Sequence, residues 1–391
     1  MGFARTRGGV CAPAGFRAAA VACGLKRSGE PDLCLIAAEE RCAAAGTFTR
    51  NAFKAAPVLV TMEHLRDGYL WAVVVNAGNA NACTGERGLR DAEAMASIAA
   101  RELGIIPEEV AVASTGVIGR FLEMDRVEEG IVRAARRLDA GSGGEAARAI
   151  MTTDTRPKEV ALDCGSFKVG GMAKGAGMIR PDMATMLAFL TTDARVDHET
   201  LARALRGAVE GTFNRITIDG CTSTNDMVLC MAGGASGYRP DEEELGACLR
   251  EACSELARDI VLDGEGATRF VTVRVRGAAG EEEARTAAMA VAESPLVKTA
   301  VFGGDPNWGR VVQAVGAALQ HIDPRAVSVD ICGIRVVERG TPADTSEDLE
   351  AAVSGREVTL EVSLGRGEVE VEVWTCDLSY EYVRINAEYH T

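Results

Sequence analysis

Apolar and polar residues follow two different patterns along the chain. In the first half, apolar runs at 34–38, 58–62 and 71–75 end near turn-forming residues, which predicts three strands. Residues 91–103 and 124–138 instead place apolar side chains at helical spacing, which predicts helices with one buried face. Strands that alternate with helices favour a layered α/β or α+β architecture.

The rhythm changes near residue 268. Val271, Val273 and Val275 alternate with polar residues, as in a half-buried strand. Two later strand-like runs, 358–364 and 368–374, flank a short segment that contains glycine, which predicts a β-hairpin. A second β unit therefore begins in the last third of the chain.

This change of pattern predicts a domain boundary between residues 266 and 280. A chain of 391 residues is longer than one typical domain of about 100 to 200 residues, so more than one substructure is expected. We expect a first domain at 1–266 and a smaller C-terminal α/β domain at 267–391. The acidic cluster at 281–283 predicts a solvated helix start.

The cysteines and histidines do not form a metal-site pattern. The twelve cysteines are dispersed, no pair has C-x2-C spacing, and none of the four histidines belongs to an H-E-x-x-H pattern. Cys248 and Cys253 fall within a predicted helix at 241–260, so we interpret them as buried thiols. Neither a metal site nor a catalytic triad based on histidine is expected.

Composition and charge narrow the class of protein. Hydrophobic residues make up 47% of the chain and charged residues 25%, as in folded, soluble proteins. The net charge of −15, without any Lys/Arg run, argues against a nucleic-acid partner. The sequence contains neither a signal-peptide pattern nor an apolar run of roughly 20 residues, so we expect no membrane partner and a cytoplasmic location.

An unusual stretch lies at 173–190. Gly175, Gly177 and Pro181 lead into a strand-like apolar run that begins at Thr185. By itself this would be an ordinary turn before a strand. The wording K-G-x-G-M-x-x-P-x-M-A-T-M-L goes further, because it resembles the cleavage motif of the glutamate N-acetyltransferase/ornithine acetyltransferase family, ArgJ.

The resemblance extends along the whole chain. Further family-like segments lie at 15–19, 24–26, 48–51, 54–58, 76–85, 114–119, 151–155, 214–220, 263–268, 305–310 and 382–389. Chance agreement of so many ordered motifs is negligible. The resemblance implies a layered αββα sandwich with a smaller C-terminal α/β domain.

The resemblance also implies self-cleavage between Ala184 and Thr185, which would leave an alpha chain at 1–184 associated with a beta chain at 185–391. A hydroxyl is a poor nucleophile until a base removes its proton. The new α-amino group of Thr185 would be that base, because its pKa of about 7.7 to 8.0 leaves a useful neutral fraction at physiological pH. Thr185 is thus the expected nucleophile in self-cleavage and in turnover.

The reaction that the resemblance implies is acetyl transfer. Thr185 would attack the acetyl carbonyl of N2-acetyl-L-ornithine, release ornithine and hold the acetyl group as an ester until L-glutamate accepts it, giving N-acetyl-L-glutamate. Thr115, through its hydroxyl, and Gly116, through its backbone N–H, would form the oxyanion hole of this ping-pong transfer. Without the resemblance, these two residues would be interpreted as a glycine turn between strands.

Substrate binding is carried over from the family to Thr152, Lys174, Thr185, Glu265, Asn386 and Thr391. Both substrates have a free carboxylate, which Lys174 or hydroxyl and amide donors would hold, while Glu265 would hold the side-chain amine of ornithine. No cofactor is implied, and the expected assembly is α2β2. Whether acetyl-CoA serves as a second donor stays open, because enzymes with and without that activity share these motifs.

Four residues depart from the usual family wording, namely Asp182, Cys221, Ser379 and His390. Asp182 lies three residues before Thr185, so it bears on the rate of cleavage and not on its chemistry.

Two alternatives to the acetyltransferase are compatible with the fold. The first is a related N-terminal-nucleophile amidase or aminopeptidase that passes the acyl group to water, against which the motifs at 76–85 and 305–310 argue. The second is a non-catalytic binding protein of the same fold. The joint presence of Thr115-Gly116, Lys174 and Ala184-Thr185 argues against that one.

Overall fold

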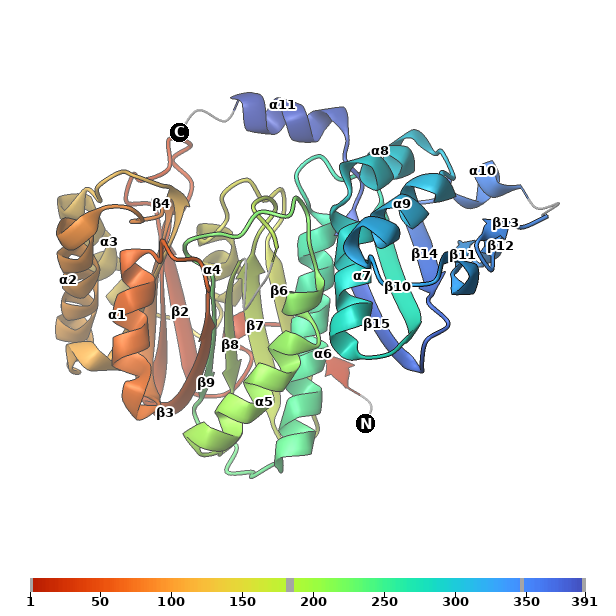
Figure 1. The fold of residues 1–391 in the computed structure, drawn as a ribbon. Coiled ribbons are helices and arrows are strands. Elements are labelled where there is room, and N and C mark those ends of the chain that lie inside the picture. Colours follow the sequence, from red (N-terminus) through yellow and green to blue (C-terminus); the bar gives the residue numbers. More distant parts are fainter. Residues whose placement is uncertain (1–2, 181–185, 345–347, 389–391) are drawn as a thin grey trace. The chain divides into compact units, whose positions relative to one another are not determined.

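The computed structural model describes residues 3–180, 186–344 and 348–388 (Figure 1). The chain forms two compact units, of which the first comprises Met1–Asn214 and Thr222–Ile260 and the second Arg215–Cys221 and Val261–Thr391. We expected a domain boundary after residue 266. In the structure, the last division between the two units follows residue 260. Within the described ranges, no helix is long and apolar enough to cross a membrane.

The first unit is built on a mixed sheet, in which nine strands are described, in the order β1-β6-β7-β8-β9-β3-β4-β5 with β2 beside β3. Its strands are β1 (Ala4–Arg5), β2 (Phe16–Val21), β3 (Leu33–Phe48), β4 (Tyr69–Asn79), β5 (Val110–Val117), β6 (Lys158–Asp163), β7 (Lys168–Lys174), β8 (Leu187–Thr192) and β9 (Met227–Ala232). Its helices are α1 (Ala56–His64), α2 (Gly85–Leu103), α3 (Met124–Ala135), α4 (Gly143–Ala149), α5 (His198–Glu210) and α6 (Glu242–Leu262).

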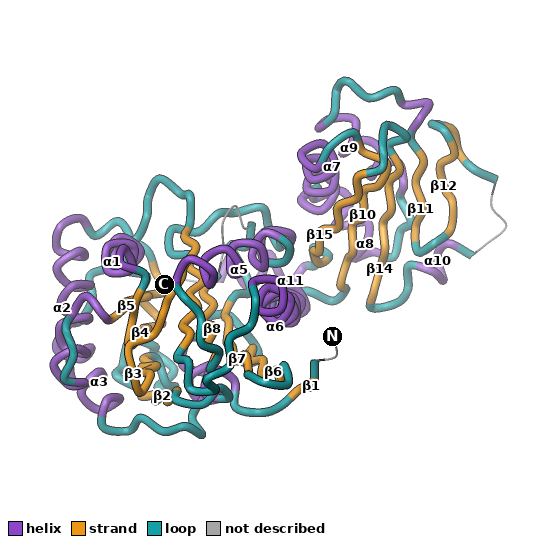
Figure 2. Tube along the Cα trace, turned by 90° about the horizontal axis from the view of Figure 1, so that it is seen from below, coloured by secondary structure: helices purple, strands orange, loops and turns teal. Residues whose placement is uncertain are grey.

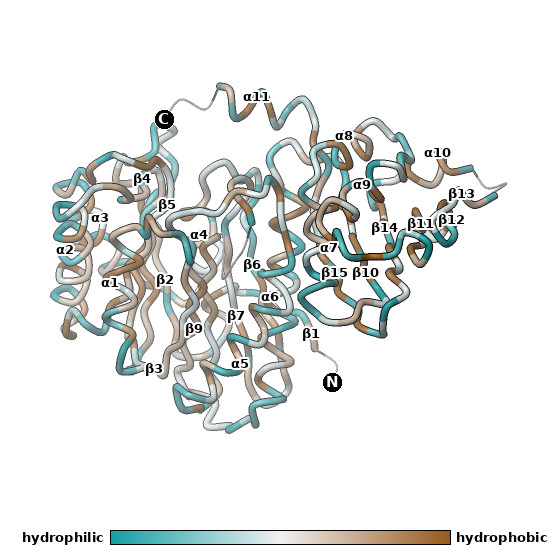
Figure 3. Tube along the Cα trace, viewed as in Figure 1, coloured by the Kyte–Doolittle hydropathy of each residue, from teal (hydrophilic) through white to brown (hydrophobic). Residues whose placement is uncertain are grey.

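The two halves of this sheet stack on each other. The long strand β3 pairs with β2 and β4 in one half and with β9 in the other, so it belongs to both. One buried cluster joins Phe16 of β2 and Val73 of β4 to Phe189 of β8 and Leu229 of β9. The apolar residues of these strands are brown in Figure 3, against the teal of many surface turns. The faces of the two halves therefore form the inner core.

Helices cover the outer faces of both halves. Met95 of α2 and Ile131 of α3 share a second buried cluster with Leu35 and Val74 of the first half. On the other half, Gly171 of β7 faces Leu256 of α6. The resulting order of helices, strands, strands and helices is the expected layered αββα sandwich (Figures 1 and 2).

Most of the sequence-based elements of this unit are confirmed. The runs at 34–38 and 71–75 lie in β3 and β4, and the periodic segments 91–103 and 124–138 lie in α2 and α3, although α3 ends at Ala135.

The strand predicted at 58–62 is wrong, because these residues belong to helix α1. Pro57 occupies the first turn of this helix, a position that proline tolerates. Val58, Val60 and Thr61 are buried, and Thr61 donates its hydroxyl hydrogen to the Val112 carbonyl at 2.7 Å. A short apolar run in a buried helix cannot be distinguished from a buried strand by periodicity.

The second unit contains a six-stranded sheet among its described residues, in the order β13-β12-β11-β14-β10-β15. Its strands are β10 (Phe270–Ala278), β11 (Ser328–Ile331), β12 (Ile334–Glu338), β13 (Thr341–Pro342), β14 (Glu357–Ser363) and β15 (Val369–Cys376). Its helices are α7 (Glu281–Glu293), α8 (Pro295–Gly303), α9 (Trp308–Ala318), α10 (Leu349–Ala352) and α11 (Tyr380–Glu388).

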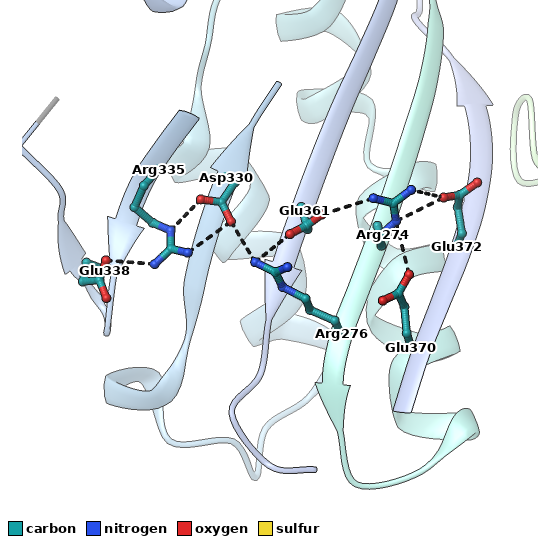
Figure 4. Close-up of polar contacts among 8 residues, drawn as sticks. All are labelled: Arg274, Arg276, Asp330, Arg335, Glu338, Glu361, Glu370 and Glu372. Atoms are coloured by element: carbon teal, nitrogen blue, oxygen red, sulfur yellow. Dashed lines mark hydrogen bonds and ion pairs between the residues drawn. The ribbon is translucent and has the colours of Figure 1, made fainter. Parts of the chain in front are cut away.

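The two faces of this sheet differ. Val271, Val273 and Val275 of β10 are buried in a cluster that includes Ala288 of α7 and Val315 of α9, as the period-two pattern predicted. The opposite face carries a row of arginines and carboxylates that runs across β15, β10, β14, β11 and β12 (Figure 4). We call this row the charge ladder; it consists of Arg274, Arg276, Asp330, Arg335, Glu338, Glu361, Glu370 and Glu372.

The predicted hairpin is wrong, although both of its strands exist. β10 lies between them, parallel to β14 and antiparallel to β15. The connecting segment crosses the end of β10, where the N–H groups of Arg366 and Gly367 donate to the Gly277 carbonyl at 2.7 and 2.9 Å. A Cβ on Gly367 would lie 2.4 Å from the Ala278 carbonyl oxygen, so glycine makes this close crossing possible.

Two smaller predictions are confirmed. Helix α6 begins one residue after the start of the predicted segment 241–260 and extends past its end, and both Cys248 and Cys253 are free and fully buried. Helix α7 begins at the acidic cluster, with Glu281 and Glu282 exposed. All twelve cysteines of the chain are free.

Candidate active site

Several predicted site residues fall outside the part of the chain that the structure describes. These are Ala184 and Thr185 at the predicted cleavage site, the substrate-binding candidate Thr391, and the family departures Asp182 and His390. The remaining candidates form one cluster in each unit.

Thr115 and Gly116 lie at the end of β5, where it runs parallel to β4. Gly116 pairs with Gly78, and its φ of 129° is in the region that favours glycine. A Cβ on Gly116 would lie 2.3 Å from the carbonyl carbon of Gly78. Only glycine fits this close approach, and Thr115 beside it is only 8% exposed. The segment is therefore a rigid strand end and not a free turn.

Side-chain amides fix this strand end from two sides. Asn76 accepts a hydrogen bond from the Ser114 hydroxyl at 2.6 Å and donates to the Asn79 carbonyl at 2.8 Å. Asn225, which lies just before β9, donates to the carbonyls of Ala80 and Ser114 at 2.6 and 2.8 Å. Ser114 directly precedes the two predicted oxyanion donors, so the amides hold the backbone that carries them.

Thr152 and Lys174 meet around a buried carboxylate, Asp154. One oxygen of Asp154 accepts a hydrogen bond from the Thr152 N–H at 2.9 Å. The other accepts from the Gly175 N–H and from the Lys158 ammonium, both at 2.7 Å. Because Gly175 follows Lys174, this carboxylate fixes the backbone at both predicted substrate-binding residues.

The surroundings of Asp154 favour its charged form. Burial by itself disfavours ionisation, but the ammonium groups of Lys174 and Lys158, together with the hydrogen bonds from Lys158 and Gly175, hold the pKa of Asp154 well below its ordinary value. The side chains of Lys158 and Asp154 are both fully buried. The Asp154 carboxylate therefore carries its negative charge within electrostatic reach of Lys174.

A second buried carboxyl, that of Asp226, behaves in the opposite way. Burial raises its pKa well above the usual range, and the attraction of Lys174 and the hydrogen bonds from Ser223 only partly offset this. Among the described residues, its Oδ2 atom has no hydrogen-bond partner. Asp226 precedes Met227, which pairs with Leu187 in β8, and Leu187 also pairs with Lys174 in β7.

Residues 225 and 226 thereby connect the parts of this cluster. Asn225 contacts the strand end that carries Thr115 and Gly116, and Asp226 lies within electrostatic reach of Lys174. The predicted oxyanion donors and the predicted carboxylate-binding lysine are thus brought into one region of the first unit.

The second unit brings Glu265 and Asn386 together. The Asn386 amide donates to a Glu265 carboxylate oxygen at 2.7 Å, although the two residues are far apart in the sequence. The neighbouring Gly266 leaves no room for a side chain, since a Cβ there would lie 2.5 Å from the Tyr382 nitrogen. Ser379, one of the family departures, donates its hydroxyl hydrogen to the Gly266 carbonyl at 2.6 Å. Helix α11, which carries Asn386, is therefore fixed next to Glu265.

Sequence reasoning missed Asp154, Lys158, Asn225 and Asp226. Asp154 stood within a family-like segment but was not singled out. The sequence signal for the other three residues was weak. A lysine is usually interpreted as a surface residue, and a polar run such as Thr222–Asp226 before a strand is usually interpreted as a surface turn. Within the described ranges, no group of three or more His, Cys, Asp and Glu residues has an arrangement that fits a metal ion.

Comparison with known proteins gives a consistent result. Residues 17–391 match the ArgJ family. The arginine biosynthesis bifunctional protein ArgJ of Symbiobacterium thermophilum is 50% identical to this chain, over 98% of this chain and 99% of the relative. The protein of the same name from Mycobacterium leprae is 47% identical, over 97% and 95%.

A solved structure adds a further comparison. The crystal structure of the arginine biosynthesis bifunctional protein ArgJ from Bacillus halodurans matches with a TM-score of 0.50 and 41% identity. The match covers 52% of this chain and 100% of the solved chain.

Proposed function

The chain belongs to the ArgJ family, and from this premise we propose that it is an acetyltransferase of arginine biosynthesis that moves acetyl from N2-acetyl-L-ornithine to L-glutamate. The observation that carries the proposal is the family match over residues 17–391, because it includes the Ala184-Thr185 pair and every other predicted site residue. Thr185 is the proposed nucleophile, which holds the acetyl group as an ester between the two half-reactions.

The chain is proposed to cut itself between Ala184 and Thr185. The solved Bacillus halodurans chain supports this, because all of it corresponds to only 52% of the present chain, as expected for one product of such a cut. The cut would fall between β7 and β8, which pair from Val169 to Lys174. On the far side of β8, β9 pairs with β3 from Ala43 to Phe48. Two rows of backbone hydrogen bonds would therefore keep the products together.

The buried charges support the proposed roles of the remaining residues. Lys174 would bind the substrate carboxylate, and Asp154 would keep it and Thr152 in place. The strand end at Thr115 and Gly116 would supply the oxyanion donors, since preorganised donors stabilise a developing charge without reorganisation. Glu265 remains the proposed contact to the amine of ornithine, and Asn386 and Thr391 remain proposed substrate-binding residues.

The direct test is to incubate the protein with N2-acetylornithine and glutamate. We expect ornithine and N-acetylglutamate in equal amounts, with the parallel double-reciprocal plots of a ping-pong scheme. Release of free acetate at the same rate with and without glutamate would identify an amidase instead.

Substitution of Thr185 and Thr115 separates two roles. Thr185→Ala removes the hydroxyl needed for cleavage and for turnover, so this variant should remain one chain of 41.1 kDa on a denaturing gel and show no transfer. The wild-type protein should give two bands, and N-terminal sequencing of the second should begin Thr-Met-Leu-Ala. An uncut wild-type chain with full activity would refute the mechanism.

Thr115→Ala should be cleaved and folded but slow. Loss of one oxyanion donor costs about 100- to 1,000-fold in kcat in other enzymes. If Thr115→Ala transferred acetyl at a near-normal rate, Thr115 would leave the catalytic assignment and the Gly116 N–H would remain.

Three finer points follow the family. We propose that the enzyme also accepts acetyl-CoA as donor, as the word bifunctional in the relatives' names suggests, that it assembles as α2β2, and that it works in the cytoplasm without a cofactor. Formation of N-acetylglutamate from acetyl-CoA and glutamate tests the first point, and the mass of the native assembly tests the second.

A further inference from the structure

Asn225 stands out among the buried polar residues that the proposed chemistry does not use. It is 6% exposed, and its whole carboxamide is engaged. The oxygen accepts from the Thr224 hydroxyl at 2.6 Å, and the nitrogen donates to the carbonyls of Ala80 and Ser114. Because both carbonyls can only accept, the nitrogen side of the amide must face them.

The two acceptors belong to the strand ends that form the oxyanion region. Ala80 follows β4, and its N–H donates to the Val117 carbonyl at 2.9 Å. Ser114 is part of β5, and its carbonyl shares a rigid peptide plane with the N–H of Thr115. Fixing the Ser114 carbonyl therefore fixes the entry into the Thr115–Gly116 segment.

We propose that Asn225 is a positioning residue for acyl transfer, which clamps the ends of β4 and β5 so that Thr115 and Gly116 meet the oxyanion. This inference rests on the proposed function, in which these two residues are the oxyanion donors. A catalytic group that moves by about 1 Å can lose about 100-fold in rate, so a residue that touches no substrate can still control turnover.

The competing explanation is that Asn225 only anchors the segment 222–226. Asn51 offers a matched control, because its amide donates to the Thr222 carbonyl at 3.1 Å and so holds the same segment, while the side-chain hydrogen bonds described for Asn51 join it to Thr222 and Phe53 and not to β4 or β5. A residue that acts only as an anchor should have the same effect as Asn51.

The test measures kcat and KM for acetyl transfer, normalised to the fraction of cleaved chain, in the wild type and in Asn225→Ala, Asn51→Ala, Thr115→Ala and the double variant Asn225→Ala/Thr115→Ala. We expect Asn225→Ala to lower kcat about 10- to 100-fold with KM changed less than about threefold, since the lost interaction acts in the transition state. Asn51→Ala should stay within about threefold of the wild type in both parameters. In the Thr115→Ala background, Asn225→Ala should cost a smaller factor, because the two residues act through one strand end.

Three results would overturn the inference: equal losses of kcat in Asn225→Ala and Asn51→Ala, a rise in KM with unchanged kcat, or fully multiplicative effects in the double variant. If Asn225→Ala does not fold, Asn225→Ser, which keeps one short donor, undergoes the same comparison. Failure of the proposed function gives a different result, because the wild type itself would then transfer no acetyl group.

Discussion

The Lys158–Asp154 pair of the first unit and the charge ladder of the second unit are built from the same kinds of residue in different surroundings. The ammonium and carboxylate of the pair are 2.7 Å apart, and both side chains are completely buried. In the ladder, Arg274 contacts three carboxylates and is 36% exposed, and Arg276 is 43% exposed (Figure 4). Water therefore reaches the arginines of the charge ladder but not the Lys158–Asp154 pair.

This difference determines what each arrangement contributes. A buried charge that loses its partner cannot be solvated, so breaking a buried pair costs about 3 to 5 kcal/mol. When an exposed pair is broken, water solvates both charges, so such a pair contributes only about 0.2 to 1 kcal/mol to the free energy of unfolding. The buried pair therefore fixes a site, whereas the ladder covers one face of a sheet with charged side chains that keep their contact with water.

The largest effect should come from breaking the buried pair. Lys158→Met leaves the Asp154 carboxylate without its hydrogen-bonded ammonium partner, so the free energy of unfolding should fall by about 3 to 5 kcal/mol. Urea unfolding at pH 7, followed by circular dichroism, measures the loss. A loss below about 1 kcal/mol would place the pair in the same class as the ladder and remove the contrast.

Substitution of Asp226 should increase the free energy of unfolding, in contrast to substitution of Lys158. The pKa of this carboxyl is raised in the folded state, so its contribution to stability is present at low pH and is lost as pH rises from the ordinary value of an aspartate toward the raised one. Asp226→Asn removes the ionisation, and we expect this variant to be more stable than the wild type by about 1 to 3 kcal/mol at pH 8.

The pH dependence provides the control for this variant. The difference between Asp226→Asn and the wild type should shrink as the pH is lowered toward 4, because Asp226 is then protonated in the folded state and the unfolded-state carboxyl also begins to bind its proton near its ordinary pKa. A difference that does not change between pH 4 and pH 8 would contradict the assignment of a raised pKa.

The smallest effect should come from the ladder. Arg274→Met removes the contacts to Glu361, Glu370 and Glu372, and we expect a loss of about 0.5 to 1.5 kcal/mol because these are partly exposed pairs in a network. The loss should nearly vanish in 1 M salt, where the screening length is about 3 Å. The effect of Lys158→Met should persist in the same salt, so the two variants measured together test the comparison directly.

Local pattern predicted the elements but not their partners. Helices α2, α3 and α6 and strand β10 were read correctly because each repeats its apolar residues over enough positions to show a period. The strand predicted at 58–62 is wrong because a buried segment of only five residues is too short to show the period of a helix or of a strand. The hairpin at 358–374 failed because nothing local to it indicates that β10, far earlier in the chain, lies between its strands.

The same limit applies to the candidate site, where single residues were predicted from the sequence but their contacts were not. The family-like motifs identified Thr152, Lys174, Glu265 and Asn386 one at a time, and the structure pairs them through Asp154 in one unit and directly in the other. Asn225 and Asp226 were not predicted, because their importance depends on residues far away along the chain: Asn225 contacts residues more than a hundred positions away, and Asp226 is influenced by Lys174 of β7.

The position of β10 between β14 and β15 also has a consequence for the newly made chain. The ribosome releases β10 before either of its neighbours, so both edges of this valine-rich strand stay unpaired while the intervening helices and β11 to β13 are translated. Helix α7 follows at once and packs on β10, so it is the first element available to shield the apolar face of this strand. Slow translation through the last strands, or a stop codon before β15, would therefore expose a strand that is prone to aggregate.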